Sequence, residues 1–191
     1  MALLEPHKIR PEVRDERCAG TAIEASSMVS FGRQEDAVAK LGAYDEGILC
    51  APTTFGKTAV AAWLIARRKV NTLVVVHRQQ LLDQWQERLR MFLDLPAKSI
   101  GHIGGGKTDR TGCVDVAVIQ SLYRKDEVKD FVGEYGQVIV DECHHISAFT
   151  FERVMRQVKT KYVVGLTATP TRKEGPPSDH FICSVAPCGS V

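Results

Sequence analysis

Two stretches of the chain carry the residue types that can hold a phosphate group. A phosphate-binding loop needs backbone N–H groups at the start of a helix, a lysine, and a hydroxyl that can bind Mg²⁺. The pattern GxxxxGK[ST] occurs literally at residues 101–108. A looser match spans residues 51–58, where Ala51 stands in place of the first glycine and the lysine is Lys57.

The residues around each match favour one of them. A short apolar run at 47–51 predicts a buried strand before the looser match, and an apolar-rich helix follows it. Residues 109–112, after Lys107, begin no helix, so that lysine would lack aligned N–H groups and a helix dipole. We therefore predict an ATP site at Lys57. Residues 104–106 are then either a flexible loop or a backbone contact for nucleic acid.

An acidic pair supplies the second half of a nucleotide site. The apolar run 138–140 ends in Asp141 and Glu142. In ATPases of this design, Asp141 would hold Mg²⁺ through water and Glu142 would orient or deprotonate the attacking water. An apolar run ending in two acids is a weak signal by itself. With a phosphate loop upstream, it predicts ATP hydrolysis.

The elements that must position these residues alternate between strands and helices. Strands are predicted at 47–51, 72–77, 114–119, 137–140 and 162–166, and helices at 34–41, 58–68, 80–92 and 149–158, the last with Ser147 in the N-cap position. Apolar strands without in/out alternation are buried on both faces, which predicts an α/β fold with a mostly parallel sheet and helices on both sides. Ligands of such sheets bind at the carboxyl ends of the strands.

Composition limits the class of protein. The 191 residues carry 25 Lys/Arg and 23 Asp/Glu, a net charge of +2, so any nucleic-acid contact must be local. The six cysteines include no CxxC pair, which favours reduced thiols and a cytoplasmic protein. The longest apolar run, residues 59–66, is too short to span a membrane.

Four motifs together resemble the first motor domain of a superfamily 2 helicase: Gln34, the loop 51–58, Asp141-Glu142-Cys143-His144 and Thr167-Ala168-Thr169. The Asp-Glu-Cys-His form, with Arg78-Gln79-Gln80-Leu81 after the second strand, is similar to DEAD/DEAH-like proteins of the restriction-subunit and xeroderma-pigmentosum-B type. The resemblance covers about residues 31–175. It implies a RecA-like P-loop NTPase fold.

The resemblance also implies roles. The residues expected to bind ATP are Gln34, which would read the adenine edge, and Thr53, Thr54, Phe55, Gly56, Lys57 and Thr58. The expected catalytic residues are Lys57, Asp141, Glu142 and His144, with Thr58 and Asp141 at the Mg²⁺ and His144 sensing the nucleotide. Thr167 and Thr169 would couple the ATP state to the nucleic-acid surface.

Simpler interpretations remain for some of these residues. Gln34 could be a solvated residue at a helix start, and residues 167–169 a strand-end turn closed by Pro170. A zinc site at Cys143-His144-His145 is disfavoured because contiguous ligands have awkward geometry.

Nucleic-acid contacts implied by the resemblance follow other strands. They are Arg78, Gly105, Gln120 and Ser121, which would contact DNA phosphates and carry no base information. Residues 61–92 hold six Lys/Arg and two Asp/Glu, a local positive charge that supports this prediction. Arg88 and Arg90 are equally well explained as solvating a helix face.

The chain departs from the family pattern in two ways. Thr54 stands where the family commonly has glycine, so either the loop backbone avoids positive φ there or phosphate binding is weakened. The sequence also stops before a second motor domain with its arginine finger. We expect residues 1–28 to be an N-terminal segment or linker, 29–175 the RecA-like ATP-binding domain, and 176–191 the start of a connection to a second RecA-like domain.

The favoured function is the ATP-binding motor domain of an ATP-dependent DNA helicase or translocase, with ATP and Mg²⁺ as cofactors. By itself such a chain should hydrolyse ATP very slowly, because an arginine finger contributes about 10³–10⁵ in rate. The alternative is a nucleotide- or DNA-binding module of a restriction or defence complex that does not hydrolyse ATP.

Overall fold

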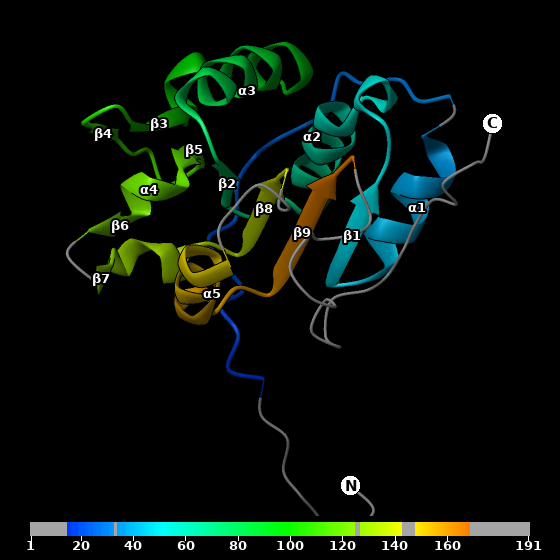
Figure 1. Ribbon diagram of the computed structural model, residues 1–191. Helices are drawn as coiled ribbons and strands as arrows, with labels where there is room; N and C mark the ends of the chain where they lie inside the picture. Colours follow the sequence, from blue (N-terminus) through cyan, green and yellow to red (C-terminus); the bar gives the residue numbers. More distant parts are fainter. Residues whose placement is uncertain (1–14, 33, 125–126, 143–147, 169–191) are drawn as a thin grey trace, which may run out of the picture.

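A seven-stranded sheet forms the centre of the computed structural model, which describes residues 15–32, 34–124, 127–142 and 148–168 (Figure 1). The strand order is β1-β9-β8-β2-β5-β3-β4, and the pairs are parallel except β3 with β4. The strands are β1 (Glu46–Cys50), β2 (Thr72–Val76), β3 (Ile100–Gly104), β4 (Lys107–Asp109), β5 (Val114–Val118), β8 (Gln137–Asp141) and β9 (Tyr162–Thr167). A separate antiparallel ribbon pairs β6 (Tyr123–Arg124) with β7 (Glu127–Val128).

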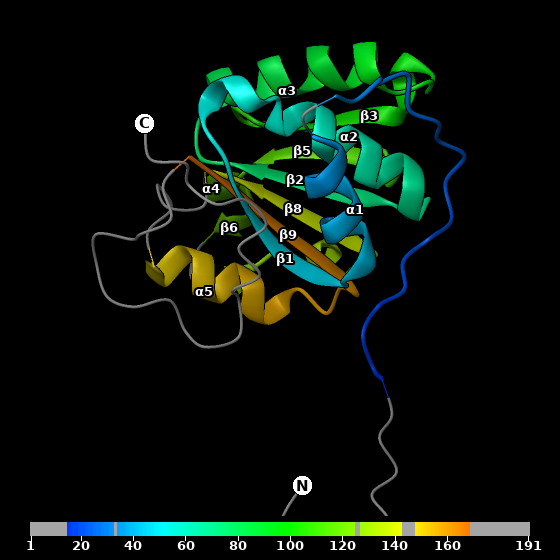
Figure 2. The same ribbon diagram turned by 90° about the vertical axis from the view of Figure 1, so that its right-hand side faces the viewer.

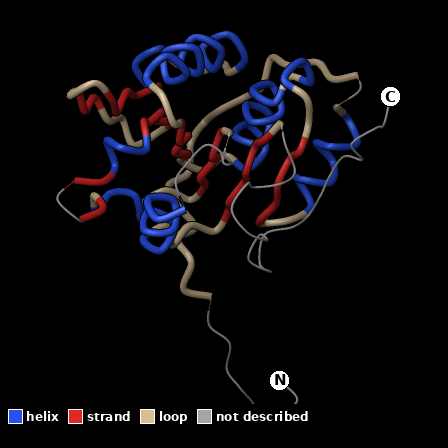
Figure 3. The backbone as a smooth tube through the Cα atoms, in the orientation of Figure 1, coloured by secondary structure: helices blue, strands red, loops and turns tan. Residues whose placement is uncertain are grey.

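Helices cover both faces of the sheet, as Figures 2 and 3 show. They are α1 (Glu35–Ala43), α2 (Lys57–Arg68), α3 (Gln79–Phe92), α4 (Ile119–Leu122) and α5 (Ala148–Gln157). In β2, Val74 and Val76 pack into the core shared with α1, α2 and α3. Leu73 and Val75 pack into the second core, shared with α4 and α5. Burial on both faces explains why the strands have continuous apolar sequences, and it confirms the predicted α/β fold.

A β-hairpin corrects one part of the prediction. The stretch 104–106 is not a flexible loop, because β3 and β4 pair across a turn at Gly105 and Gly106. Both glycines have positive φ, 57° and 82°, as tight hairpin turns require. The sequence of β3 contains two glycines and no run of β-branched residues, so its strand signal was weak. The predicted N-cap Ser147 lies outside the described residues.

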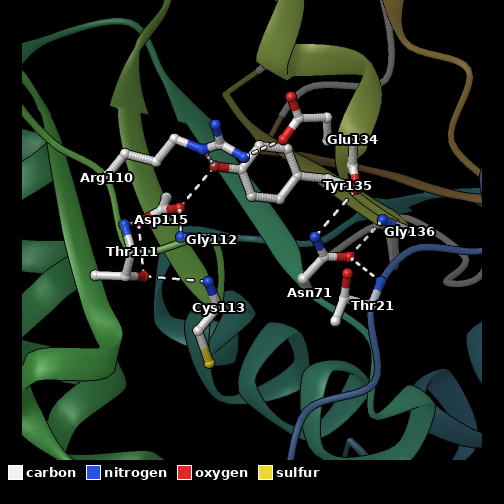
Figure 4. A network of polar contacts seen from close by, with 10 residues as sticks. All are labelled: Thr21, Asn71, Arg110, Thr111, Gly112, Cys113, Asp115, Glu134, Tyr135 and Gly136. Atoms are coloured by element: carbon white, nitrogen blue, oxygen red, sulfur yellow. Dashed lines mark hydrogen bonds and ion pairs between the residues drawn. The ribbon is translucent and has the colours of Figure 1, made fainter.

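Buried polar residues join the strands at their amino ends, opposite the predicted ligand edge (Figure 4). The Asp115 carboxylate is fully buried and accepts hydrogen bonds from Thr111, from the Gly112 N–H and from the Tyr135 hydroxyl. Burial raises the pKa of the Tyr135 hydroxyl, and its hydrogen bond to Asp115 raises that pKa further. Because both carboxylate oxygens of Asp115 accept hydrogen bonds from protein donors, this cluster stabilises the fold.

Residues 15–28 run along the same amino-end side of the sheet (Figure 2, blue). Isolated bridges join Cys18 to Thr160, Ala22 to Val70 and Ser27 to Leu93. Asn71 fastens this segment, since its Oδ1 accepts from the N–H groups of Thr21 and Gly136 at 2.9 Å each. Within the described part of the chain, every helix is too short or too polar to cross a bilayer.

Candidate active site

The sheet order divides the predicted residues between two halves of one edge. The loop after β1, the acids at the end of β8 and Thr167 at the end of β9 follow three adjacent strands. Arg78, the Gly105 turn and Gln120-Ser121 follow the adjacent strands β2, β3 and β5. At the carboxyl ends of the parallel strands, the residues predicted to bind ATP therefore lie on one side and the predicted nucleic-acid contacts on the other.

The loop 51–56 leads from β1 directly into α2. Thr53–Phe55 forms a 3₁₀ turn, and Gly56 has a left-handed conformation with φ 84° and ψ 38°. Helix α2 then begins at Lys57, so its free N–H groups and positive dipole end face the loop. Among the described residues other than glycine, only Lys69 and Glu142 have positive φ. Thr54 therefore has an ordinary backbone conformation. This is the first of the two alternatives above, the other being weakened phosphate binding.

Lys57 and Glu142 form an ion pair inside the site. The Lys57 Nζ lies 2.9 Å from Glu142 Oε1 and donates a second hydrogen bond to the Ala51 carbonyl at 3.3 Å. The Lys57 side chain is only 8% exposed and that of Glu142 19%. Glu142 has φ 47°, an uncommon conformation for a residue with a Cβ, and such backbones concentrate at functional sites. The pair joins the phosphate loop to the end of β8.

The two oxygen donors predicted for Mg²⁺ each bind a side chain of α3. Trp85 Nε1 donates to Asp141 Oδ2 at 2.7 Å, and Arg88 Nη1 donates to Thr58 Oγ1 at 3.3 Å. Burial raises the pKa of Asp141, and the Trp85 hydrogen bond opposes that shift. The sequence alone assigns no role to Trp85 and leaves Arg88 open between a nucleic-acid contact and a solvated helix face. Only the packing of α3 beside α2 reveals that both reach this site.

A pocket of about 390 Å³ connects these groups. Its walls include Thr54, Lys57 and Thr58 from the loop and α2, Asp141 and Glu142 from β8, and one face of α3. A carboxylate and a hydroxyl are hard oxygen ligands of the kind that Mg²⁺ prefers, so the donor set fits this ion. Among the described residues there is no cluster of three His, Cys, Asp or Glu that could hold a metal by itself.

Gln34 lies beside the loop. Its Nε2 donates to the Phe55 carbonyl at 2.8 Å, and its Oε1 accepts from the Gly32 N–H at 3.4 Å. The side chain is half-buried at the start of α1 and contacts the loop directly. Its role in reading adenine stays a prediction. His144, Thr169 and the disfavoured zinc ligands at 143–145 lie outside the described residues.

The literal motif match folds differently. Lys107 is exposed on β4, the outermost strand, and no helix follows it. This confirms the prediction that residues 109–112 begin no helix. Of the predicted nucleic-acid contacts, Arg78 and Gln120 are exposed and Ser121 is half-buried. Gly105 lies at the hairpin tip, with Gln79 of α3 beside it.

Known proteins resemble this chain over most of its length. The family model described as type III restriction enzyme, res subunit, matches residues 28–172. The DNA 3'-5' translocase XPB2 of Sulfurisphaera tokodaii is 36% identical over 129 residues, 68% of this chain and 28% of that protein. The putative DNA 3'-5' helicase Rad25 of Halobacterium salinarum is 32% identical over 159 residues, 82% of this chain and 26% of that protein. The chain thus spans between a quarter and three tenths of the length of these relatives.

Solved structures share the fold. The UvsW helicase of bacteriophage T4 gives a TM-score of 0.62 at 18% identity, covering 88% of this chain and 68% of that one. The Hef helicase domain of Pyrococcus furiosus gives 0.59 at 22% identity, covering 74% and 33%. Together with the family match, these findings identify the chain as a member of the type III restriction enzyme res subunit family, with the N-terminal RecA-like domain of a superfamily 2 helicase.

Proposed function

We propose that this chain is the ATP-binding motor domain of a DNA helicase or translocase, in which Mg-ATP binds at residues 51–58. The observation that carries the proposal is the meeting of Lys57, Asp141 and Glu142 in one pocket at the amino end of α2. Helicase relatives make ATP and Mg²⁺ the natural ligands. A second RecA-like domain of the same protein would complete the cleft, and the protein would act in the cytoplasm.

The ion pair suggests what the residues do when nucleotide arrives. A phosphate group supplies negative charge that competes with Glu142 for Lys57. Lys57 would then turn to the β- and γ-phosphate oxygens, and Glu142 would be released to orient the attacking water. Mg²⁺ neutralises charge on the phosphates when bound. Asp141 and Thr58 would hold it, directly or through water.

DNA would bind along the other half of the strand edge. Arg78 and Gln120 are exposed there, and Ser121 and the Gly105 turn offer a hydroxyl and backbone N–H groups. Such groups contact phosphates and do not read bases, which suits a motor that moves along a strand. Thr167, whose carbonyl accepts from the Ala51 N–H at 3.0 Å, would couple the two halves together with Thr169.

The alternative, a module that binds nucleotide but does not hydrolyse it, would be favoured if Thr54 weakened the phosphate loop. The ordinary backbone of Thr54 removes that reason for expecting a weakened site. Glu142→Gln separates the two functions, because it keeps the side-chain volume but removes the base. We expect DNA-stimulated ATP hydrolysis by the whole protein to fall about 100-fold or more while nucleotide binding persists. Unchanged turnover would exclude Glu142 as a catalytic residue.

A further inference from the structure

One face of α3 lines the nucleotide pocket. Its side chains there are Leu81, Gln84, Trp85, Arg88 and Phe92, which recur at helical spacing. A second face of α3 is fixed to the sheet, where Gln86 Nε2 donates to the Gly101 carbonyl at 2.9 Å and Gln86 Oε1 contacts His102. Because these contacts hold the helix against the sheet, the backbone positions of Trp85 and Arg88 beside the pocket are fixed.

Trp85 contacts the acid expected to bind the metal. Its indole is 3% exposed and its only polar atom, Nε1, donates to Asp141 Oδ2. That bond anchors one carboxylate oxygen of Asp141 at the end of β8. It also fixes the rotamer of Asp141, because the indole is packed and cannot follow a rotated carboxylate.

Arg88 contacts the hydroxyl expected to bind the same metal. Its guanidinium donates to Thr58 Oγ1, so a positively charged side chain lies at this oxygen. A divalent ion at Thr58 would meet a positive charge and a competing donor. Arg88 is exposed and can turn away from the hydroxyl, whereas buried Trp85 cannot move in this way.

We propose that this face of α3 sets the magnesium dependence of nucleotide binding, with Trp85 orienting Asp141 for the metal and Arg88 standing in for the metal at Thr58. The inference rests on the proposed nucleotide site and adds two positioning residues to it. The two have opposite effects. Trp85 favours binding with metal, and Arg88 supports the phosphate-binding pocket without it.

The test is the ratio of two dissociation constants for a fluorescent ATP analogue, that in EDTA divided by that in Mg²⁺. Trp85→Phe keeps an aromatic ring at this position but removes the N–H, and should lower the ratio about 10-fold. Arg88→Met keeps the aliphatic length but removes the charge, and should raise the ratio roughly 2- to 5-fold. Arg90→Met, an exposed arginine of α3 that does not line the pocket, should leave it unchanged.

The two variants should shift the ratio in opposite directions. A general loss of structure would instead raise both dissociation constants together. Thermal unfolding of each variant checks that the fold persists. If the wild type binds and Lys57→Ala does not, but Trp85→Phe and Arg88→Met keep the wild-type ratio or move it in the same direction, the inference is wrong and the nucleotide site stands. If the wild type shows no binding that depends on Lys57, both fail.

Discussion

The triplet Gly-Lys-Thr occurs twice in this chain, and the two copies fold in different ways. At Gly56 it follows a 3₁₀ turn and opens α2, and Lys57 is buried beside Glu142. At Gly106 it closes a hairpin turn and enters β4, and Lys107 is exposed. We expect the phosphate site at the copy whose lysine opens a helix, because a helix start supplies aligned N–H groups.

The hairpin needs its glycines for packing. A Cβ at Gly101 would lie 1.8 Å from Asp115 Oδ1 and 2.7 Å from the Asp109 carbonyl oxygen. A Cβ at Gly104 would lie 2.9 Å from a Leu82 methyl group. The close approach of β3 to its neighbours and the hairpin turn are sufficient to explain the glycines of the literal motif.

The comparison of the two Gly-Lys-Thr copies predicts its largest effect at Gly101, in the strand that leads to the second copy. Gly101→Ala would force the Cβ against the Asp115 carboxylate, whose two oxygens already accept hydrogen bonds from the protein. We expect a loss of about 3 kcal/mol or more in the free energy of unfolding. Urea denaturation measures this loss. A change of less than about 1 kcal/mol would mean that β5 and the Asp115 cluster can shift, and that the glycine is not required by packing.

The next largest effect compares two glycines with nearly the same backbone. Gly56 has φ 84° and Gly106 has φ 82°, and a Cβ at either meets no atom closer than 3.3 Å. Gly56→Ala and Gly106→Ala should each lower the free energy of unfolding by about 1–2 kcal/mol, the strain of a left-handed residue. Only Gly56→Ala should also weaken nucleotide binding. Equal loss of binding in both variants would contradict the assignment of the two loops.

The smallest effect concerns Thr54. Because its backbone lies in an ordinary 3₁₀ turn, Thr54→Gly removes no strain and adds chain entropy to the unfolded state. We expect a loss of about 0.5–1 kcal/mol in the free energy of unfolding and no gain in nucleotide affinity. A clear gain in affinity would show that the threonine weakens the site.

Much of this arrangement follows from the sequence for a physical reason. Strands buried on both faces have long apolar runs, and the helix that opens at Lys57 has an apolar-rich sequence. Both elements can therefore be predicted from the local sequence. Gly101 gave no such signal, since the atom that excludes a side chain there belongs to Asp115 in another strand. Likewise, Trp85 and Arg88 reach the site only because the sheet order brings β8 beside β2 and α3 beside α2.

The most direct measurement is Mg²⁺-dependent binding of a fluorescent ATP analogue to the wild type, Lys57→Ala and Lys107→Ala. Removing a lysine that contacts phosphate should cost about 10- to 100-fold in affinity. We predict that loss for Lys57→Ala, with Lys107→Ala equal to the wild type. Loss of binding in Lys107→Ala with Lys57→Ala unaffected would contradict the assignment and place the nucleotide at the hairpin.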